Sequence, residues 1–415
     1  MKLGKYSIGL GDRFSHQGKA QLRAIMKANT TGLEINPVWN KSNREHTYVH
    51  SEPIDTRKEA DEAVKTLSYT GEYFVDADHI NLSTVERFVA VSDFFTLDVA
   101  SFIGKSASQD DVNKFITSCE KYMGKLQIPG IKNPIEITEE LLETIAQKFL
   151  VATQQAAEIY EYLVKTKGVG NFVTEVSMDE VEKPQTPVEL LFILKMLADK
   201  GIPAQTIAPK FTGRFNKGVD YVGDLNQFAK EFEEDVLVID FAVKEFGLPE
   251  ELKLSVHSGS DKFSIYPIMA DIINRHDKGL HLKTAGTTWL EEVIGLAKAD
   301  GEGLKLAKKI YANSLNRKDE LCAPYADVID IDGSKLPTID EVNSWSSEKY
   351  QNTLRHIPGN PDYNPNFRQL IHVAYAVAAE LGEEYTKLLE KYADVIGGCV
   401  EENIYERHLK RLFSL

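Results

Sequence analysis

Residues 73–79 read YFVDADH, an aromatic and aliphatic start that runs into two aspartates and a histidine. Side chains alternate between the two sides of a strand, so Val75, Ala77 and His79 share one side, and Asp76 and Asp78 share the other. A strand that ends in ionisable groups is typical of a parallel barrel, in which functional residues lie at the carboxyl ends of the strands. The fold then depends on whether this pattern recurs.

The pattern of a short apolar strand followed by polar residues recurs along the first 290 residues. The candidates are SIGLGD (7–12), GLEINPVW (32–39), YFVDADH (73–79), FFTLDVA (94–100), NFVTEVS (171–177), QTIAPKF (205–211), KLSVHSG (253–259) and LHLKTAG (280–286). Amphipathic segments with apolar residues at i, i+3, i+4 and i+7 separate most of them. Strands that alternate with helices favour right-handed crossovers and a parallel sheet. Eight such units predict an α/β protein, a (β/α)8 TIM barrel.

Two regions do not fit the simple alternation. About seventy residues separate the fourth and fifth strands, and they predict an extra helical insertion, with a proline-containing loop (128–134) reaching over the active face. From about residue 300 onward only helical patterns occur. We therefore expect a catalytic barrel over residues 1–300 and a helical C-terminal extension over 301–415, packed on the barrel or forming a dimer contact.

Composition limits the partners. The formal net charge is −15 and the sequence pI is about 5.3, which disfavours nucleic acid because phosphate backbones need a basic surface. No apolar stretch approaches the roughly 18 residues of a membrane span, and the start lacks a signal-peptide core. Three cysteines without metal-site spacing argue against a disulfide scaffold or a thiolate site. We expect a cytoplasmic protein that acts on a small molecule, with a homodimer possible.

Three histidines fall at or near strand ends: His79, His257 and His281. A single strand histidine is more often a core residue. Three on one face favour a site for one divalent metal ion, which could be zinc, nickel, cobalt or manganese, with a position left open for substrate. Glu175 is the best carboxylate for a fourth ligand or a proton donor, although Asp179 and Glu180 compete for that role and the whole loop could be merely solvated.

Two polar loops are candidates for binding an anion. In HSGSDK, residues 257–262, backbone N–H groups before a predicted helix could bind a carboxylate or phosphate. In KFTGRFNKGVDY, residues 210–221, several cations follow a strand. An ordinary helix cap and a solvated loop are the alternatives. The expected substrate-binding residues are Asp12, Arg13, His16, Asp98, Lys210, Arg214, Asn216, Asp220, Ser258, Ser260, Asp261, Lys262 and Lys283.

With these segments the sequence resembles the tagaturonate epimerase family, bacterial enzymes that interconvert tagaturonate and fructuronate. The stretches that carry the resemblance are GDRFSHQGKAQ, DADHINL, FFTLDVAS, APKFTGRFNKGVDYVGDL, LSVHSGSDKFSIYPI and HLKTAGTTWLE, which together span the predicted barrel. The two histidine-containing stretches near residues 257 and 281 are the most specific. The site is also similar to that of class II, metal-dependent aldolases.

The resemblance implies a divalent metal held by His79, His257 and His281, with Asp78 as the proton acceptor. It also implies a donor glutamate near the GRFxKG loop, where this sequence has Asn216 and no acid. Glu175 or a water molecule is then expected to take that role, unless the substrate differs.

The expected function is metal-dependent epimerisation of keto-hexuronates, possibly by retro-aldol chemistry. The stereocentre that inverts lies β to the ketone, so removing its C–H proton gives no stabilised enolate, whereas breaking the adjacent C–C bond does. Two alternatives stay open. One is an aldolase or isomerase acting on a related, possibly phosphorylated, keto-sugar, and the other is a catalytically inactive barrel that binds sugar acids.

Overall fold

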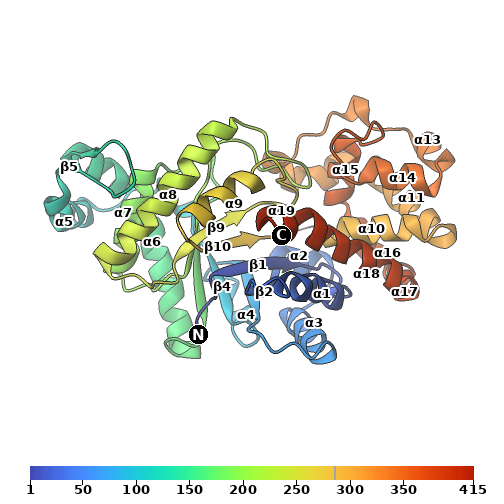
Figure 1. Ribbon diagram of the computed structural model, residues 1–415, viewed down its shortest axis with the longest axis horizontal. Coiled ribbons are helices and arrows are strands. Elements are labelled where there is room, and N and C mark those ends of the chain that lie inside the picture. Colours follow the sequence, from blue (N-terminus) through green and yellow to red (C-terminus); the bar gives the residue numbers. More distant parts are fainter. Residues whose placement is uncertain (285–286) are drawn as a thin grey trace.

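The computed structural model describes residues 1–284 and 287–415, and its centre is a closed barrel of parallel strands (Figure 1). Around the barrel the order is β1-β10-β9-β8-β7-β4-β3-β2. The strands are β1 (Tyr6–Gly11), β2 (Ile35–Ser42), β3 (Phe74–Ile80), β4 (Phe94–Asp98), β7 (Val173–Ser177), β8 (Thr206–Ala208), β9 (Lys253–His257) and β10 (Leu280–Lys283). All eight predicted strands are confirmed, and with them the TIM barrel. The predicted eighth segment extends to residue 286, so its last two residues lie outside the described part of the chain.

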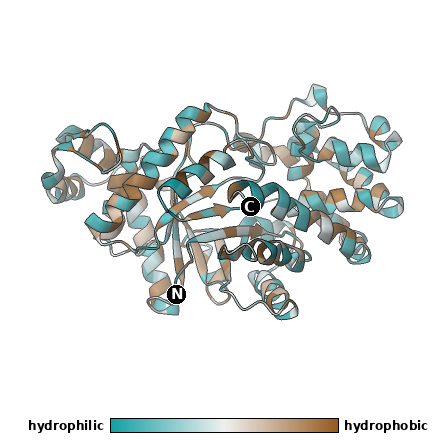
Figure 2. Ribbon diagram, in the orientation of Figure 1, coloured by the Kyte–Doolittle hydropathy of each residue, from teal (hydrophilic) through white to brown (hydrophobic). Residues whose placement is uncertain are grey.

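Helices cover the outside of the barrel and turn their apolar sides toward the strands (Figure 2). They are α1 (Gly18–Asn29), α2 (Asn43–Tyr48), α3 (Pro53–Thr66), α4 (Val85–Phe88), α6 (Glu139–Lys167), α7 (Pro187–Asp199), α8 (Leu225–Phe246), α9 (Tyr266–Arg275) and α10 (Thr288–Lys298). Helix α7 begins as its sequence indicates, because Thr186 and Glu189 form a capping box around Pro187 at the first helical position.

The interior of the barrel changes character along its axis. At the amino-terminal end it is filled by a small apolar cluster, whose members are Leu3, Val38, Phe74, Phe94 and Val173. Toward the carboxyl ends, the inward positions are polar: Asp76 follows Phe74 on β3, and Thr96 follows Phe94 on β4, with both side chains buried. The helices pack on the outward apolar residues, so the strands can carry charged groups inside without losing their core.

A β-bulge in β3 explains how Asp78 and His79 face one site. The pairing of β3 with β4 shifts register between Ala77 and Ile80. His79 has φ of +53°, in the left-handed region that non-glycine residues seldom adopt. The strict alternation of the strand therefore ends at Asp78, and the bulge turns the imidazole of His79 toward the barrel mouth.

The insertion after β4 contains more than helices. Helix α5 (Gln109–Cys119) is followed by an antiparallel pair, β5 (Gly124–Leu126) and β6 (Ile135–Ile137), and then by α6. The proline-containing loop between β5 and β6 lies against the outside of α8, because a Cβ atom at Gly130 would be 2.8 Å from Leu237. The expectation that this loop reaches over the active face is corrected. Its apolar residues, including buried Ile128, instead extend the outer core.

The C-terminal quarter is helical, at the opposite end of the molecule from the insertion (Figure 1). Its elements are α11 (Gly301–Asn316), α12 (Lys318–Cys322), α13 (Ile339–Ser344), α14 (Ser347–Leu354), α15 (Pro365–Val373), α16 (Tyr375–Leu381), α17 (Glu383–Lys391), α18 (Ala393–Glu402), a π-helix (Asn403–Leu409) and α19 (Lys410–Leu412). They pack mainly on α10, α1 and α9. Helix α10 is thus enclosed between the barrel and these helices.

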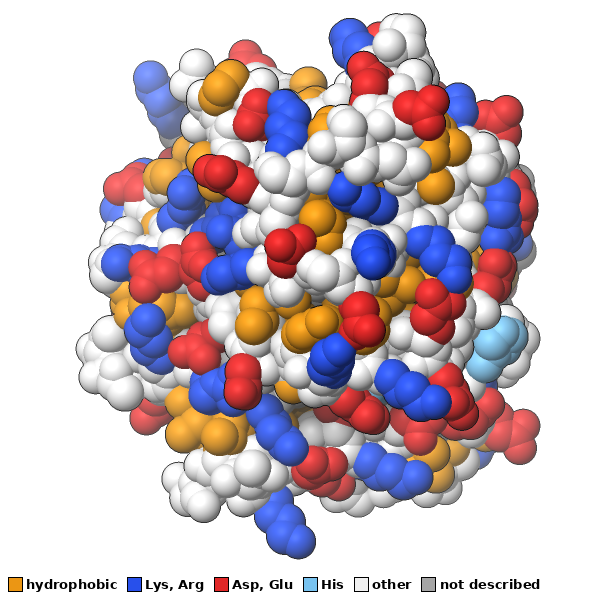
Figure 3. All heavy atoms as spheres, turned by 90° about the vertical axis from the view of Figure 1, so that its right-hand side faces the viewer, with side chains coloured by type: hydrophobic (Ala, Val, Ile, Leu, Met, Phe, Trp, Pro, Cys, Tyr) orange, Lys and Arg blue, Asp and Glu red, His pale blue; other side chains and the backbone are white. Residues whose placement is uncertain are grey.

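The outer face of the C-terminal helices carries acidic and basic side chains interspersed with small apolar areas (Figure 3). This face therefore offers no extended basic surface to a nucleic acid. Among the described helices, none combines the length and the hydropathy that crossing a membrane requires. The homodimer and the boundary at residue 300 stay predictions.

Candidate active site

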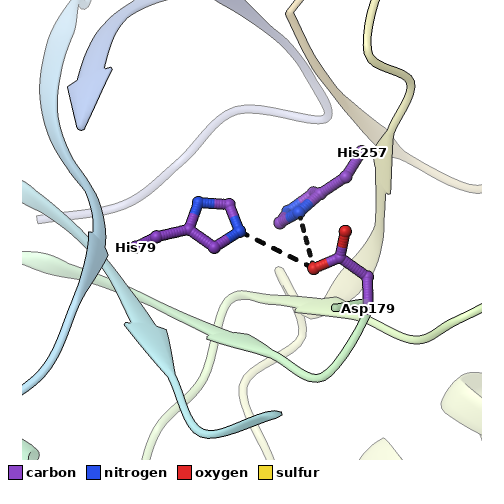
Figure 4. Close-up of side chains that lie close together, drawn as sticks. All are labelled: His79, Asp179 and His257. Carbon is purple, nitrogen blue, oxygen red and sulfur yellow. Dashed lines mark ion pairs between the residues drawn. The ribbon is translucent and has the colours of Figure 1, made fainter. Parts of the chain in front are cut away.

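Three side chains from different strands meet at the barrel mouth (Figure 4). His79 is the next-to-last residue of β3, His257 ends β9, and Asp179 follows β7. Asp179 Oδ1 lies 3.0 Å from His257 Nδ1 and 3.6 Å from His79 Nε2. One ligand atom from each of the three lies within 4.8 Å of the others, so these residues could together hold a metal ion.

Each histidine is held from behind by a carboxylate. His79 Nδ1 lies 2.6 Å from Asp78 Oδ1, and His257 Nε2 lies 2.9 Å from Glu175 Oε1. The forward nitrogens, His79 Nε2 and His257 Nδ1, are buried and have no hydrogen-bond partner within the described ranges. A carboxylate behind an imidazole whose other nitrogen points at a shared position is the usual environment of a metal-ligating histidine.

Lys283 occupies the centre of the charged layer. Its Nζ lies 2.7 Å from Asp76 Oδ2, 2.9 Å from Asp78 Oδ1 and 3.1 Å from Glu175 Oε1, and it also contacts Thr96 Oγ1. The side chain is 3% exposed. Three carboxylates thus surround its ammonium group, and substrate binding by Lys283 stays a prediction.

The pKa shifts follow from this crowding. Burial alone would raise the pKa of Asp78, but Lys283 and His79 outweigh it and hold that pKa well below the usual range. Burial raises the pKa of Asp76 to about 7, despite the opposing ammonium of Lys283. Burial would lower the pKa of His79, yet Asp78 and Asp179 hold it well above the ordinary value. The pocket therefore favours a cation between the imidazoles and Asp179, whether a proton or a metal ion.

Glu175 is fully buried and its oxygens are taken. It accepts hydrogen bonds from Thr96 at 3.2 Å and Thr206 at 2.8 Å, besides its contacts with His257 and Lys283. Burial would raise its pKa, but Lys283 and His257 hold the pKa well below normal. A carboxylate this enclosed orients its neighbours, and it has no free oxygen with which to donate a proton to substrate.

His281 lies outside the histidine group. In the pairing of β9 with β10, Lys283 is opposite His257, whereas His281 is opposite Ser255, deeper in the barrel. His281 Nδ1 hydrogen-bonds Ser7 Oγ at 2.8 Å, and burial lowers the pKa of the imidazole to about 3. The structure does not bring His281 together with His79 and His257. Asp179, from the acidic loop after β7, completes the group in its place.

Asp98 is a further carboxyl group of this part of the mouth, close enough to Asp179 and Glu180 to feel their charge. It ends β4, accepts a hydrogen bond from the Ala100 N–H at 3.1 Å and is half-buried. Burial raises its pKa, with His79 opposing. Asp78 and Asp98 both interact with His79, and their environments push their pKa values in opposite directions, an arrangement that separates acid–base roles.

Several expected binding residues instead fasten loops. Asp12 is buried and accepts the backbone N–H groups of residues 14–17, and Asp220 accepts the N–H and hydroxyl of Ser264. Arg214 points to the surface, where it pairs with Asp330 at 2.8 Å. His16 is exposed and bonds the Phe14 carbonyl oxygen. None of these side chains is directed at the histidine group.

The loop after β9 is also internally saturated. Ser258 Oγ donates to carbonyl oxygens of β10 and the next residue, and Ser260 Oγ contacts Thr287 and donates to Asp261. Lys262 Nζ donates to the carbonyl oxygens of Asn216 at 2.9 Å and Val219 at 2.7 Å. These side chains fix the loop to its neighbours, and an anion site at the backbone N–H groups of this loop stays a prediction. Arg13 and Lys210 remain half-buried at the mouth, and substrate binding by Lys210 stays a prediction.

A closed (β/α)8 barrel with paired carboxylates and imidazoles at the carboxyl ends of its strands defines an enzyme of the TIM-barrel class. A family model described as tagaturonate epimerase matches residues 1–412. The chain belongs to this family of carbohydrate epimerases, which are isomerases.

Individual relatives agree with the family. A tagaturonate/fructuronate epimerase from Thermotoga maritima is 30% identical over 98% of this chain and 80% of its own length. A glycerol-complexed crystal structure of the fructuronate-tagaturonate epimerase from Cohnella laeviribosi has a TM-score of 0.82 at 24% identity, covering 99% of this chain and 82% of that one. The native crystal structure of the same enzyme has a TM-score of 0.81. These structures support the fold.

Proposed function

We propose that this protein is a divalent-metal-dependent epimerase that interconverts keto-hexuronates of the tagaturonate and fructuronate type. The family supplies the substrate class. The observation that carries the metal dependence is the pair of imidazoles, each backed by a carboxylate, whose free nitrogens face Asp179. The ion would be held by His79, His257 and Asp179.

The spacing of these atoms suits a tetrahedral ion. Nitrogen and oxygen ligands about 2.1 Å from a zinc ion lie about 3.4 Å from each other. The two distances from the imidazole nitrogens to Asp179 Oδ1, 3.0 and 3.6 Å, bracket that value. Three protein ligands leave a further position for substrate. Zinc, nickel, cobalt and manganese all accept this donor set.

Charge balance favours the same assignment. Three buried or half-buried carboxyl groups, those of Asp76, Asp78 and Glu175, surround the ammonium of Lys283, and a fourth, that of Asp179, lies against the imidazoles. Uncompensated charge is costly away from water. A divalent cation beside Asp179 offsets the excess of negative charge without protonating the histidines.

When bound, the ion supplies Lewis-acid polarisation of substrate oxygens. For the chain itself, we propose that Asp98 takes the proton of the hydroxyl group β to the ketone. The adjacent C–C bond then breaks, its electron pair forms an enediolate, and the β carbon becomes an aldehyde. The aldehyde turns, the enediolate carbon adds to its other face, and the new alkoxide regains the proton. Asp78 and Glu175 hold the imidazoles throughout.

The defining experiment is to incubate the purified protein with fructuronate before and after removal of metal by a chelator. We expect NMR to follow conversion into tagaturonate, loss of turnover on chelation, and recovery when one equivalent of a divalent ion is added. Full turnover after complete metal removal contradicts the metal dependence. Accumulation of two smaller fragments without tagaturonate would instead make the enzyme an aldolase.

The roles of the two aspartates can be separated. Asp98→Asn is expected to lower turnover about 100- to 10,000-fold with metal affinity unchanged, because general acid–base catalysis contributes about that much. Asp78→Asn is expected to weaken metal binding about 10- to 100-fold, because its carboxylate orients His79. The opposite pattern, with turnover lost in Asp78→Asn and metal affinity intact, would assign proton transfer to Asp78.

A further inference from the structure

The mouth of the barrel has acidic side chains on one side and basic side chains on the other. The acidic groups Asp78, Asp98 and Asp179 come from β3, β4 and the loop after β7, which are adjacent in the barrel. On the other side, cations come from the loops after β1 and β8, which carry Arg13 and Lys217. A C-terminal helix, α15, lies between these two loops and contributes His372.

His372 packs directly on the loop that carries Lys217. A Cβ atom at Gly218 would lie 3.1 Å from His372 Cδ2, a tight contact, and the φ of +74° at this position also favours glycine. The Gly218 N–H donates to the carbonyl oxygen of Gly259 at 3.0 Å, two residues beyond His257. The aliphatic part of Lys217 also contacts this loop, because a Cβ atom at Gly259 would lie 3.4 Å from Lys217 Cδ. His372 and Lys217 therefore lie near the loop that follows His257, a ligand of the candidate metal site.

Arg13, from the loop after β1, also lies close to this part of the C-terminal helices. Its guanidinium stacks on the ring of Tyr375 at 4.4 Å, one helical turn beyond His372. Arg13 pairs with Glu45 at 3.3 Å through Nη2, but its Nε is buried and makes no hydrogen bond within the described ranges. A buried N–H of a guanidinium without an acceptor is rare and points to a missing partner.

Some of the charged groups around His372 already have ion-pair or hydrogen-bond partners, and others do not. Arg368 is paired with Asp261, and Lys262 donates to backbone carbonyl oxygens. Lys217 makes no ion pair in the part of the chain that the structure describes, and neither nitrogen of His372 makes a hydrogen bond there. Burial, and then Arg13 and Lys217, hold the pKa of His372 well below its usual value, so the ring stays neutral.

We propose that Arg13, Lys217 and His372 bind the carboxylate of the sugar acid, so that the C-terminal helices supply a residue that determines specificity. This inference rests on the proposed function and adds the substrate's orientation to it. The carboxylate lies on the cationic side, and the carbon atoms that react lie toward His79, His257 and Asp179. Arg13 and Lys217 supply charge, and neutral His372 supplies one N–H donor.

The test compares a keto-hexuronate with the matching neutral ketohexose, in which a CH2OH group replaces the carboxylate. For Arg13→Met and Lys217→Met we expect kcat/KM for the uronate to fall about 10- to 100-fold, the worth of a charge-assisted hydrogen bond. For His372→Leu we expect about a 10-fold fall, with partial recovery in His372→Gln, which keeps an N–H donor. The much lower activity on the neutral sugar should not change.

Lys230→Met is the matched control, because it removes an exposed cation of α8 whose partner is Glu234 in the same helix. It should leave both substrates unaffected. Equal losses on the uronate and the neutral sugar would make the three residues structural and overturn the inference. A wild-type protein with no activity on any uronate would instead contradict the proposed function.

A second readout does not depend on turnover. Calorimetric titration of the metal-free protein with a non-reacting hexuronate should show binding that His372→Leu and Arg13→Met weaken. Equal affinity in wild type and both variants would also overturn the assignment.

Discussion

Two buried clusters of histidines and carboxylates among the described residues differ in the sign of their central charge. At the barrel mouth one ammonium, that of Lys283, is surrounded by acids, and two histidines point free nitrogens at Asp179. Behind the loop after β9 one carboxylate, that of Asp261, is surrounded by bases. Arg368 Nη2 lies 2.7 Å away, His356 Nδ1 3.1 Å and His408 Nε2 3.2 Å.

The two clusters also differ in exposure. Asp261, Arg368 and His408 are 0% exposed, and all three bases of that cluster come from the C-terminal quarter of the chain. His79 and Asp179 are each 21% exposed. The Asp261 cluster is a balanced, buried connection between the barrel and the C-terminal helices. The cluster at the barrel mouth has an excess of negative charge and is partly accessible to solvent. Residue type alone does not mark a functional site; the sign of the imbalance and access to solvent do.

The largest effect is expected from breaking the mouth cluster at a histidine. His257→Ala should lower turnover at least about 1000-fold, because a Lewis acid supplies several kcal/mol of transition-state stabilisation and this variant loses a ligand to it. The thermal midpoint should change little. Turnover of the variant and metal content after dialysis are the measurements, and a variant that keeps both would show that His257 is no ligand.

Breaking the Asp261 cluster should affect stability instead. Asp261→Asn leaves Arg368 buried without a counter-ion, which costs about 3–5 kcal/mol of unfolding free energy. Its metal affinity should stay within about threefold of wild type. Denaturant unfolding and metal titration separate the two effects. Loss of metal binding in a folded Asp261→Asn protein would show that the clusters are not independent.

A smaller effect is expected at a carboxylate that only orients a ligand. Glu175→Gln keeps the shape of the side chain but weakens its hold on His257, so metal affinity should fall about 10- to 100-fold. Competition with a chelator of known affinity measures this change. An unchanged affinity would mean that Glu175 contributes nothing to the position of the imidazole.

Near neutral pH the smallest effect concerns buried His46, whose side chain is bonded to a hydroxyl group. His46 bonds Ser51 Oγ at 2.8 Å, and burial, together with Lys41 and Arg87, lowers its pKa to about 3. Because the unfolded chain binds a proton below about pH 6.5 and the folded chain does not, stability falls as the pH drops toward 3, by at most about 1.4 kcal/mol per pH unit. Unfolding of His46→Gln should show a shallower decline over this range. An identical pH dependence would exclude His46 as its source.

The barrel could be predicted from the sequence because its signal is repeated: eight apolar strands, each ending in polar groups, separated by amphipathic helices. The pair β5 and β6 could not, since each strand has three residues and no clear alternation. The position of the proline-containing loop also could not be predicted, because apolar loop residues do not indicate which surface they will cover.

Within the site, residue types were predicted better than roles. His79 and His257 were identified from strand ends, but His281 and Lys283 are both inward residues of β10, and only the strand register decides which one meets His257. The orienting roles of Asp78 and Glu175 depend on distances that no local pattern encodes. His372 carried no signal in the sequence, because it lies in an amphipathic helix far along the chain from the barrel strands.

The central claim is that the imbalance at the mouth binds one divalent ion. The most direct measurement is calorimetric titration of zinc into metal-free wild type, Asp179→Ala and Asp261→Asn. We predict one equivalent bound by wild type and by Asp261→Asn, and no tight binding by Asp179→Ala. Tight binding by Asp179→Ala that equals the wild type, or none by the wild type, would contradict the account.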